Sequence, residues 1–314
     1  MTDPVFVYRG DAIARYGFGE DHPFGADRHG AFHAELAQSD LGDAIRYSEP
    51  VGATRELLGL FHTADYIDFI AESSATGAGY LDGGDTPAYP GVFEDASAVA
   101  GTTVSAVDAV MHGRARRAFV PIAGLHHAAR DHASGFCVFN DCGIAAEYLR
   151  VEHGLRRIAY VDIDAHHGDG VYYGFEDDPF VVFADLHEDG RYLFPGTGRA
   201  DEVGKGEARD LKLNIPLPPG SGDEAFLAAW PAVEALLARH RPEFILLQCG
   251  ADSLAGDPLT HLQFTEDAHG RAAERLCALA DEYCDGRIVA TGGGGYDRRN
   301  LVRAWTRVVE ALAA

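Results

Sequence analysis

The densest group of chemically active side chains is the segment 160–170, which reads Tyr-Val-Asp-Ile-Asp-Ala-His-His-Gly-Asp-Gly. It overlaps the apolar stretch 157–161, whose length and branched residues are typical of a buried parallel strand. Because side chains alternate along an extended chain, Asp162, Asp164 and His166 point to one side. Buried carboxylates need a cation or a tight hydrogen-bond network, so the segment predicts a metal site. The alternative is a solvated acidic loop that contains histidines by chance.

Adjacent histidines follow a second strand-like stretch, 118–122. His126 and His127 suit proton transfer because imidazole titrates near neutral pH, and a carboxylate partner can keep one ring protonated while the other remains a base. A histidine pair alone is weak evidence for catalysis. Here Asp162 and Asp169 are available as acidic partners, so we expect all four side chains to take part in catalysis.

A third strand-like stretch, 244–248, leads to Asp252. Together with Asp164 and His166, this carboxylate would give one nitrogen and two oxygen ligands. That set leaves open positions for water and a substrate carbonyl, as a catalytic divalent site requires. Asp252 and Asp257 also have a simpler interpretation as helix-cap or turn residues, and this interpretation carries more weight for Asp257.

Four glycines at 292–295 precede Tyr296, after the strand-like stretch 287–291. Backbone can approach a ligand closely there, and a mobile phenol aimed at a polarised carbonyl would stabilise a developing oxyanion. Four glycines could instead cradle a phosphate. However, the segment has neither a Gly-x-Gly-x-x-Gly pattern before a helix nor a Gly-Lys-Ser/Thr ending, so we interpret Tyr296 as an oxyanion stabiliser.

The elements that must position these groups alternate along the chain. Strand-like stretches and amphipathic segments of helix length follow one another, which predicts an α/β fold with a mainly parallel central sheet flanked by helices. We expect a single domain over residues 1–314, with the active site at the C-terminal strand ends. Pro231 suggests a kink or a late helix start. The predicted strands are 5–8, 118–122, 158–163, 180–183, 211–215, 244–248 and 287–291, and the predicted helices are 64–74, 96–111, 140–152, 224–239, 266–281 and 299–313.

Composition narrows the class of function. The 314 residues are 46% hydrophobic and 24% charged, which is typical of a globular protein. A net charge of −23 disfavours nucleic-acid binding and would attract cationic substrates, although solubility is the simpler explanation for most of this charge. No stretch is apolar enough to span a membrane, and the N-terminus, Met-Thr-Asp-Pro-Val, lacks a signal-peptide pattern, so we expect a cytoplasmic protein. The five cysteines include no Cys-x-x-Cys pair and are expected to be reduced thiols.

Taken in order, the motifs resemble those of the zinc-dependent histone deacetylase superfamily, which includes bacterial acetoin-utilisation-type deacetylases and acetylpolyamine amidohydrolases. The resemblance spans nearly the whole chain. It is carried by 16–19 (Tyr-Gly-Phe-Gly), 22–24 (His-Pro-Phe), 124–128 (Gly-Leu-His-His-Ala), 135–137 (Gly-Phe-Cys), 140–141 (Asn-Asp), 162–170, 194–198 (Phe-Pro-Gly-Thr-Gly), 250–252 (Gly-Ala-Asp) and 292–296.

The resemblance implies the same roles as the residues themselves. Asp164, His166 and Asp252 would bind one Zn²⁺. It also implies a narrow apolar tunnel for an acyl-lysine-like chain, with an exit for acetate near Arg28. The implied substrate-binding residues are Gly135, Phe136 and Phe194 in the tunnel and Asp85 at its rim.

Members of this superfamily also hold a structural K⁺ next to the zinc. The resemblance implies that carbonyl groups of Asp164 and His166 and the side chain of Asp162 bind it, together with a hydroxyl-bearing residue. In this chain Asp185 stands at that last position, and Leu186 beside it belongs to the implied site. The additional carboxylate would either strengthen cation binding or alter the acidity of the histidine pair.

The combined prediction is a zinc-dependent amidohydrolase that removes acetyl or another short acyl group from an acylated amine. Acyl-lysine in a peptide or protein is the first expected substrate, and acetylpolyamines or other small amides are the alternative. No nucleic-acid or membrane partner is expected. A two-manganese ureohydrolase of arginase type is disfavoured because the segment 252–257 lacks an Asp-x-Asp pair. A catalytically idle acyl-lysine-binding protein would have lost a ligand, a histidine or Tyr296, and all are present.

Overall fold

The computed structural model describes residues 4–19 and 21–314, so the first three residues of the N-terminal segment discussed above lie outside it. At the centre of the fold lies an eight-stranded sheet in the order β2-β1-β3-β8-β7-β4-β5-β6. Every pair of neighbouring strands is parallel, which confirms the predicted α/β fold. The strands are β1 (Val5–Tyr8), β2 (Ile45–Ser48), β3 (Ala118–Val120), β4 (Ile158–Asp162), β5 (Val181–Glu188), β6 (Lys212–Leu217), β7 (Ile245–Gln248) and β8 (Ile288–Thr291).

The register of the sheet brings the polar strand ends into one row. Asp162 of β4 lies opposite Asp185 of β5 and Gln248 of β7. Gln248 in turn lies opposite Thr291 of β8, which pairs with Val120 of β3. β4, β7 and β8 are buried along their whole length, which explains their mainly apolar sequences. The segments that follow these strands therefore all begin at the carboxyl ends of the strands, on the same side of the molecule.

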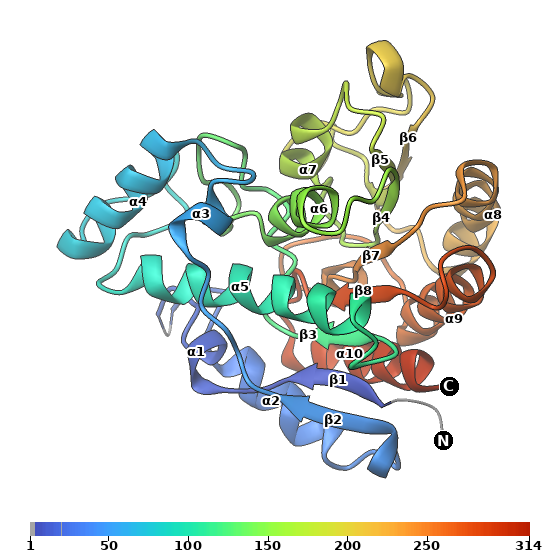
Figure 1. The fold of residues 1–314 in the computed structure, drawn as a ribbon, viewed down its shortest axis with the longest axis horizontal. Helices are drawn as coiled ribbons and strands as arrows, with labels where there is room; N and C mark the ends of the chain where they lie inside the picture. The colour runs from blue at the N-terminus through green and yellow to red at the C-terminus, as the bar shows by residue number, and fades with distance from the viewer. Residues whose placement is uncertain (1–3, 20) are drawn as a thin grey trace.

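Two groups of helices cover the sheet (Figure 1). In one group α10 contacts α2 and α9, and α9 contacts α8; in the other, α5 packs against α4, α6 and β3. None of the helices in the described part of the chain is both long and apolar enough to cross a bilayer. The helices are α1 (Asp11–Ala14), α2 (Asp27–Leu36), α3 (Arg55–Leu58), α4 (Ala64–Thr76), α5 (Val92–Met111), α6 (Asp141–Val151), α7 (Asp169–Gly174), α8 (Asp223–His240), α9 (Glu266–Tyr283) and α10 (Arg298–Ala313), with 3-10 turns η1 (Gly42–Ala44), η2 (Gly206–Ala208) and η3 (Ala251–Ser253).

The structure differs from the predicted elements in two instructive places. β2 was missed because it lies at the edge of the sheet, where Arg46 and Tyr47 are exposed and the apolar signal is interrupted. The predicted late start of α8 is wrong, since the helix begins at Asp223 and continues through Pro231. Pro231 lies on the exposed side of α8, where water can satisfy the carbonyl that lacks an amide partner.

Candidate metal and proton-transfer site

The predicted polar clusters meet at the carboxyl edge of four neighbouring strands, β3, β8, β7 and β4. His126 and His127 follow β3, Tyr296 follows β8, Asp252 lies in η3 after β7, and the loop 163–168 follows β4. The candidate site therefore lies at the C-terminal strand ends, where the fold predicts it.

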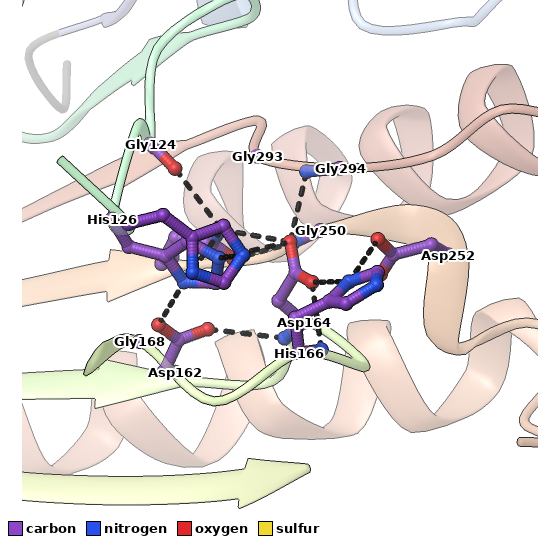
Figure 2. A network of polar contacts seen from close by, with 12 residues as sticks. Gly124, His126, Asp162, Asp164, His166, Gly168, Gly250, Asp252, Gly293 and Gly294 are labelled. Carbon is purple, nitrogen blue, oxygen red and sulfur yellow. Dashed lines mark hydrogen bonds and ion pairs between the residues drawn. The ribbon is translucent and has the colours of Figure 1, made fainter. Parts of the chain in front are cut away.

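Asp164, His166 and Asp252 form a buried cluster (Figure 2). The Nδ1 atom of His166 lies 3.1 Å from Asp164 Oδ1 and 3.1 Å from Asp252 Oδ2. Zinc bonds of about 2.0–2.2 Å to nitrogen and oxygen place the ligand atoms of a tetrahedral site about 3.3–3.6 Å apart. The separations in the cluster are slightly shorter than this spacing. Slightly narrower angles at the metal, or a small outward shift of the side chains, would accommodate the ion.

N–H groups hold both carboxylates in this orientation (Figure 2). Asp164 Oδ2 accepts hydrogen bonds from Gln248 Nε2 and from Gly294 N, each at 2.9 Å. Asp252 Oδ1 accepts one from Ala165 N at 2.9 Å. A Cβ atom at Gly294 would collide with the Asp252 carboxylate, so the loop can approach this closely only as glycine. Outer partners that orient the ligands in this way are typical of metal centres.

The electrostatics of the cluster favour a cation. Burial, reinforced by the negative charge of Asp164, raises the pKa of Asp252 to about 7. Two buried carboxylates beside one imidazole are costly without a compensating positive charge. One nitrogen and two oxygen ligands fit a catalytic divalent metal with coordination positions left open. The residues present therefore fit the implied ion.

His126 and His127 each lie against a carboxylate of their own. His126 Nδ1 lies 2.7 Å from Asp162 Oδ2, and His127 Nδ1 lies 2.6 Å from Asp169 Oδ1. The two Nε2 atoms are 3.2 Å apart. The hydroxyl of Tyr160 donates a further hydrogen bond of 2.6 Å to Asp162 Oδ2, which fixes this carboxylate behind His126.

The two rings differ in acidity. Burial alone would lower the pKa of His126, but the charges of Asp162 and Asp164 outweigh it and raise this pKa to about 10. Burial and the positive charge of His126 lower the pKa of His127, although Asp169 opposes them. These opposite shifts favour a protonated His126 beside a neutral His127 at neutral pH. Neighbouring groups whose pKa values are pushed apart are typical of acid–base catalysis.

A cavity of about 210 Å³ opens beside the cluster and the histidine pair. Gly135 has a φ of +54°, and a Cβ atom there would lie 2.5 Å from the His127 ring and 2.9 Å from the Phe194 ring. Only glycine suits this position, since it tolerates the left-handed backbone and leaves the cavity open. All four predicted substrate-binding residues line the cavity, which is formed by Asp85, His127, Gly135, Phe136, His166, Leu193, Phe194, Leu259 and Tyr296.

Tyr296 is anchored at this cavity by Asp257. Burial, with the negative charges of Asp252 and Asp164, raises the pKa of Tyr296 well above its ordinary value, so the phenol keeps its proton. The Tyr296 N–H donates to Asp257 Oδ2 at 2.8 Å, and the Leu259 N–H donates to Asp257 Oδ1 at 2.9 Å. Asp257 is thus more than a turn residue, because it joins the two loops that carry Tyr296 and Leu259.

Arg28 lies fully buried against the glycine loop. Its Nε donates to the Gly295 carbonyl at 3.0 Å, and its Nη2 donates to the Gly293 carbonyl at 2.5 Å. Nη1 has no hydrogen-bond partner among the described residues. Burial lowers the pKa of Arg28 to about 10, which still leaves a full positive charge at neutral pH. The acetate exit assigned to this residue stays a prediction.

Asp185, the residue at the implied potassium position, is buried, and each of its carboxylate oxygens has one partner. Its Oδ2 accepts a hydrogen bond from Gly168 N at 2.9 Å, and its Oδ1 lies 2.7 Å from His187 Nδ1. The charge of Asp185 outweighs burial and raises the pKa of His187. The charge of Asp185 also acts to raise the pKa of His126, after the larger effects of Asp162 and Asp164.

Comparison with protein-family models matches residues 22–312 to the histone deacetylase domain. The chain belongs to the histone deacetylase family. It is 40% identical to the acetoin utilization protein AcuC of Bacillus subtilis over 317 residues, which cover 98% of this chain and 81% of that protein. It is 33% identical to histone deacetylase clr6 of Schizosaccharomyces pombe, over 98% of this chain and 76% of that protein. The HDA15 HD domain has the same fold, with a TM-score of 0.90 and 27% identity over 99% of this chain and 90% of that chain.

Membership of the histone deacetylase family makes this chain a hydrolase that acts on amide bonds. The family is metal-dependent, and the three side chains of the buried cluster are the group at this site that could bind a metal.

Sequence reasoning missed several residues that shape this histone deacetylase site. Gln248 bonds both Asp164 and the Gly124 carbonyl, and its only signal was a polar residue ending an apolar stretch. Asp141 accepts hydrogen bonds from the Gly124 and Leu125 N–H groups and so holds the turn before the histidine pair. Its signal was the Asn-Asp motif, to which no role was given. Leu193 and Leu259, which line the cavity, lie in loops without any distinctive pattern.

Proposed function

We propose that this histone deacetylase is a zinc-dependent amidohydrolase that removes acetyl or another short acyl group from acyl-lysine in a peptide or protein. The observation that carries the proposal is the convergence of three groups on one cavity: the Asp164–His166–Asp252 cluster, the neutral base His127 and the protonated phenol of Tyr296. The cluster would hold the zinc. When bound, the zinc would polarise the amide carbonyl and lower the pKa of a neighbouring water.

His127 is the proton acceptor in this proposal. It lines the cavity and is neutral at pH 7, so it can take a proton from the attacking water. Asp169 holds the ring through Nδ1 and stabilises the imidazolium that forms. The protonated His126 is only 3.2 Å away between Nε2 atoms, and its charge makes the His127 imidazolium a stronger acid. This repulsion favours transfer of the proton to the leaving amine.

Tyr296 supplies the hydrogen bond to the oxyanion. Its raised pKa keeps the hydroxyl protonated and therefore a donor. Donors that are fixed before the reaction begins stabilise developing charge without reorganisation, and removing one typically costs about 10²–10³ in kcat. The Asp257 carboxylate holds the backbone of Tyr296 in place for this role.

The shape of the cavity supports an acyl-lysine side chain as the substrate. Phe136 and Phe194 give it apolar walls that suit the methylene groups of lysine, and Asp85 lies at its lining. Burial, together with the charge of Asp82, raises the pKa of Asp85 to about 6, so this carboxylate is ionised at neutral pH and can accept a substrate N–H. A net charge of −23 suits lysine-rich proteins and acetylated polyamines alike, so small acetylated amines remain the alternative substrate.

We further propose that a structural K⁺ lies between strand β5 and the end of β4 with the loop that follows it, bound by the residues implied above, Asp162, Asp164, His166, Asp185 and Leu186. The register of the sheet supports this, since Asp162 and Asp185 are direct partners on β4 and β5. We also propose that the protein is located in the cytoplasm.

The test is release of free amine from acetyl-lysine peptides and acetylated polyamines, measured in parallel with zinc-loaded wild type, Tyr296→Phe and Tyr47→Phe. Tyr47 is an exposed tyrosine of β2 and serves as the matched control. We expect peptide turnover that falls about 10²–10³-fold in Tyr296→Phe only. Preferential turnover of polyamines would transfer the proposal to small amines. No turnover of either substrate by zinc-loaded wild type would contradict deacetylation of these amines, and would point to another acyl group or small amide, or to an idle acyl-lysine-binding protein.

A further inference from the structure

A second group of side chains of metal-ligand type lies at the amino ends of the strands, whereas the candidate active site lies at their carboxyl ends. Asp108 lies near the end of α5 and His112 caps this helix, just before the chain enters β3. His153 lies in the turn between α6 and β4. Both segments lead into the amino ends of their strands, whereas the deacetylase cluster follows the carboxyl ends. The two groups of side chains are therefore separated by the length of the strands.

One carboxylate oxygen is the centre of this group. Asp108 Oδ1 lies 3.1 Å from His112 Nδ1 and 3.6 Å from His153 Nε2. One ligand atom from each residue lies within 4.8 Å of the others. The ligand atoms of a tetrahedral zinc site lie about 3.3–3.6 Å apart, so these two separations bracket the required value. In the deacetylase cluster the corresponding nitrogen-to-oxygen separations are 3.1 Å.

The surroundings of His153 also favour a ligand. Its side chain is only 13% exposed, and its Nε2 is buried without a hydrogen-bond partner in the described part of the chain. A buried polar atom of this kind normally has a partner, but Asp108 Oδ1 at 3.6 Å is too far away for a hydrogen bond to His153 Nε2.

Hydrogen bonds from two neighbouring side chains hold the Asp108 carboxylate, one on each oxygen. Arg114 Nη2 donates to Asp108 Oδ2 at 2.7 Å, and the Tyr148 hydroxyl donates to Oδ1 at 3.2 Å. These bonds orient the carboxylate as the outer partners of a metal ligand do. Two features oppose cation binding: the charge of Arg114, and the 2.9 Å contact of His112 Nδ1 with the Asp108 carbonyl, which a metal would replace. The His112 side chain is 60% exposed, so an ion can reach the group from solvent.

We propose that Asp108, His112 and His153 form a second divalent-cation site, with water completing the coordination. Two imidazoles and one carboxylate suit Zn²⁺ and similar transition metals rather than Mg²⁺ or Ca²⁺, which prefer oxygen ligands alone. A bound ion would join the end of α5 to the turn before β4. The site has weaker affinity than the deacetylase cluster, because Arg114 repels the cation and His112 is solvent-exposed.

Zinc binding by metal-stripped full-length protein tests this proposal, by equilibrium dialysis over a series of free Zn²⁺ concentrations. We expect two zinc ions per wild-type chain and one in each of His112→Ala and His153→Ala, since loss of a direct ligand exceeds the roughly 10–100-fold loss caused by removal of an outer partner. His132→Ala is the matched control and should retain both ions. His132 is an exposed histidine 2.7 Å from Asp131, and that pair is not part of a three-residue group among the described residues.

A single zinc per wild-type chain, or retention of the second zinc in either histidine variant, would overturn the proposal. His112 is exposed, so its removal leaves the fold intact even if His153→Ala should unfold. Asp252→Ala separates this inference from the deacetylase proposal. It should remove the tighter ion only, and a failure to do so would contradict the deacetylase metal site without affecting the second one.

Discussion

Replacing Asp257 by asparagine should reduce turnover by misplacing Tyr296, without removing any group that touches the substrate amide. Asp257 is buried, and its two oxygens accept hydrogen bonds from Leu259 N at 2.9 Å and from Tyr296 N at 2.8 Å. A third N–H, that of Asp297, lies 3.4 Å from the same oxygen as Tyr296 N. Asparagine offers one acceptor oxygen, so its amide NH₂ must face a backbone N–H on one side.

The magnitude follows from that mismatch. A buried donor left without an acceptor costs about 1–3 kcal/mol. If the Tyr296 loop shifts to relieve this cost, the same free energy is added to the activation barrier of the reaction. Each 1.36 kcal/mol added to that barrier lowers the rate tenfold. The expected loss in kcat/KM is therefore about 5- to 150-fold, smaller than for Tyr296→Phe because the phenol is still present. The free energy of unfolding should fall by no more than the same 1–3 kcal/mol.

Amine release from an acetyl-lysine peptide measures this loss, with zinc content and thermal unfolding followed in the same samples. Asp201→Asn is the matched control, since its side chain is 69% exposed and pairs with Arg199 at the surface. The zinc content of Asp257→Asn should equal that of wild type, because Asp257 is not a ligand. Folded, zinc-loaded Asp257→Asn with wild-type kcat/KM would refute the assignment of Asp257 as a positioning residue for Tyr296.

Three further predictions concern the histidine pair, the cavity and the metal. The neutral form of His127 is lost as pH falls, so kcat/KM should decline below about pH 6.5. His126→Gln removes a positive charge beside His127 and should therefore move this acidic decline to higher pH. A decline at the same pH in both proteins would contradict the assignment of His127 as the base. Gly135→Ala should lower kcat/KM at least about tenfold with zinc retained, because the added Cβ meets His127 and Phe194, whereas Gly83→Ala, which meets nothing nearby, should not. Chelation should abolish turnover and lower the unfolding temperature, and added zinc should restore both; turnover that survives complete removal would exclude a catalytic metal.

The parts of the site that were predictable from sequence are those in which one short segment carries both a strand and its polar end. The apolar run before Asp162 specifies a buried parallel strand, and the alternation beyond it places Asp164 and His166 together. Parallel strands end at one edge, which brings Asp252 and the histidine pair to the same place. These inferences need only the pleat of a strand and the topology of an α/β sheet.

The parts that were not predictable depend on contacts between distant segments. Asp257 has the local pattern of a turn residue, and its bond to Tyr296 spans 39 positions. Arg28 reaches the Gly293 carbonyl across 265 positions, and α2, which carries it, has polar and charged residues among its buried ones. The pairing of Asp185 with His187 is local, but the position of Asp185 beside Asp162 depends on how β5 pairs with β4. The periodicity of apolar residues in the sequence does not predict such contacts between distant segments.

We propose that one zinc ion, held by Asp164, His166 and Asp252, makes this chain an amide hydrolase. The most direct measurement is a titration of metal-stripped protein with Zn²⁺ while amine release from an acetyl-lysine peptide is recorded. Turnover should rise in proportion to zinc up to one equivalent per chain, equally in wild type and His112→Ala, and should be absent from Asp252→Ala. Turnover by metal-free protein, or Asp252→Ala that still responds to zinc as wild type does, would contradict the claim.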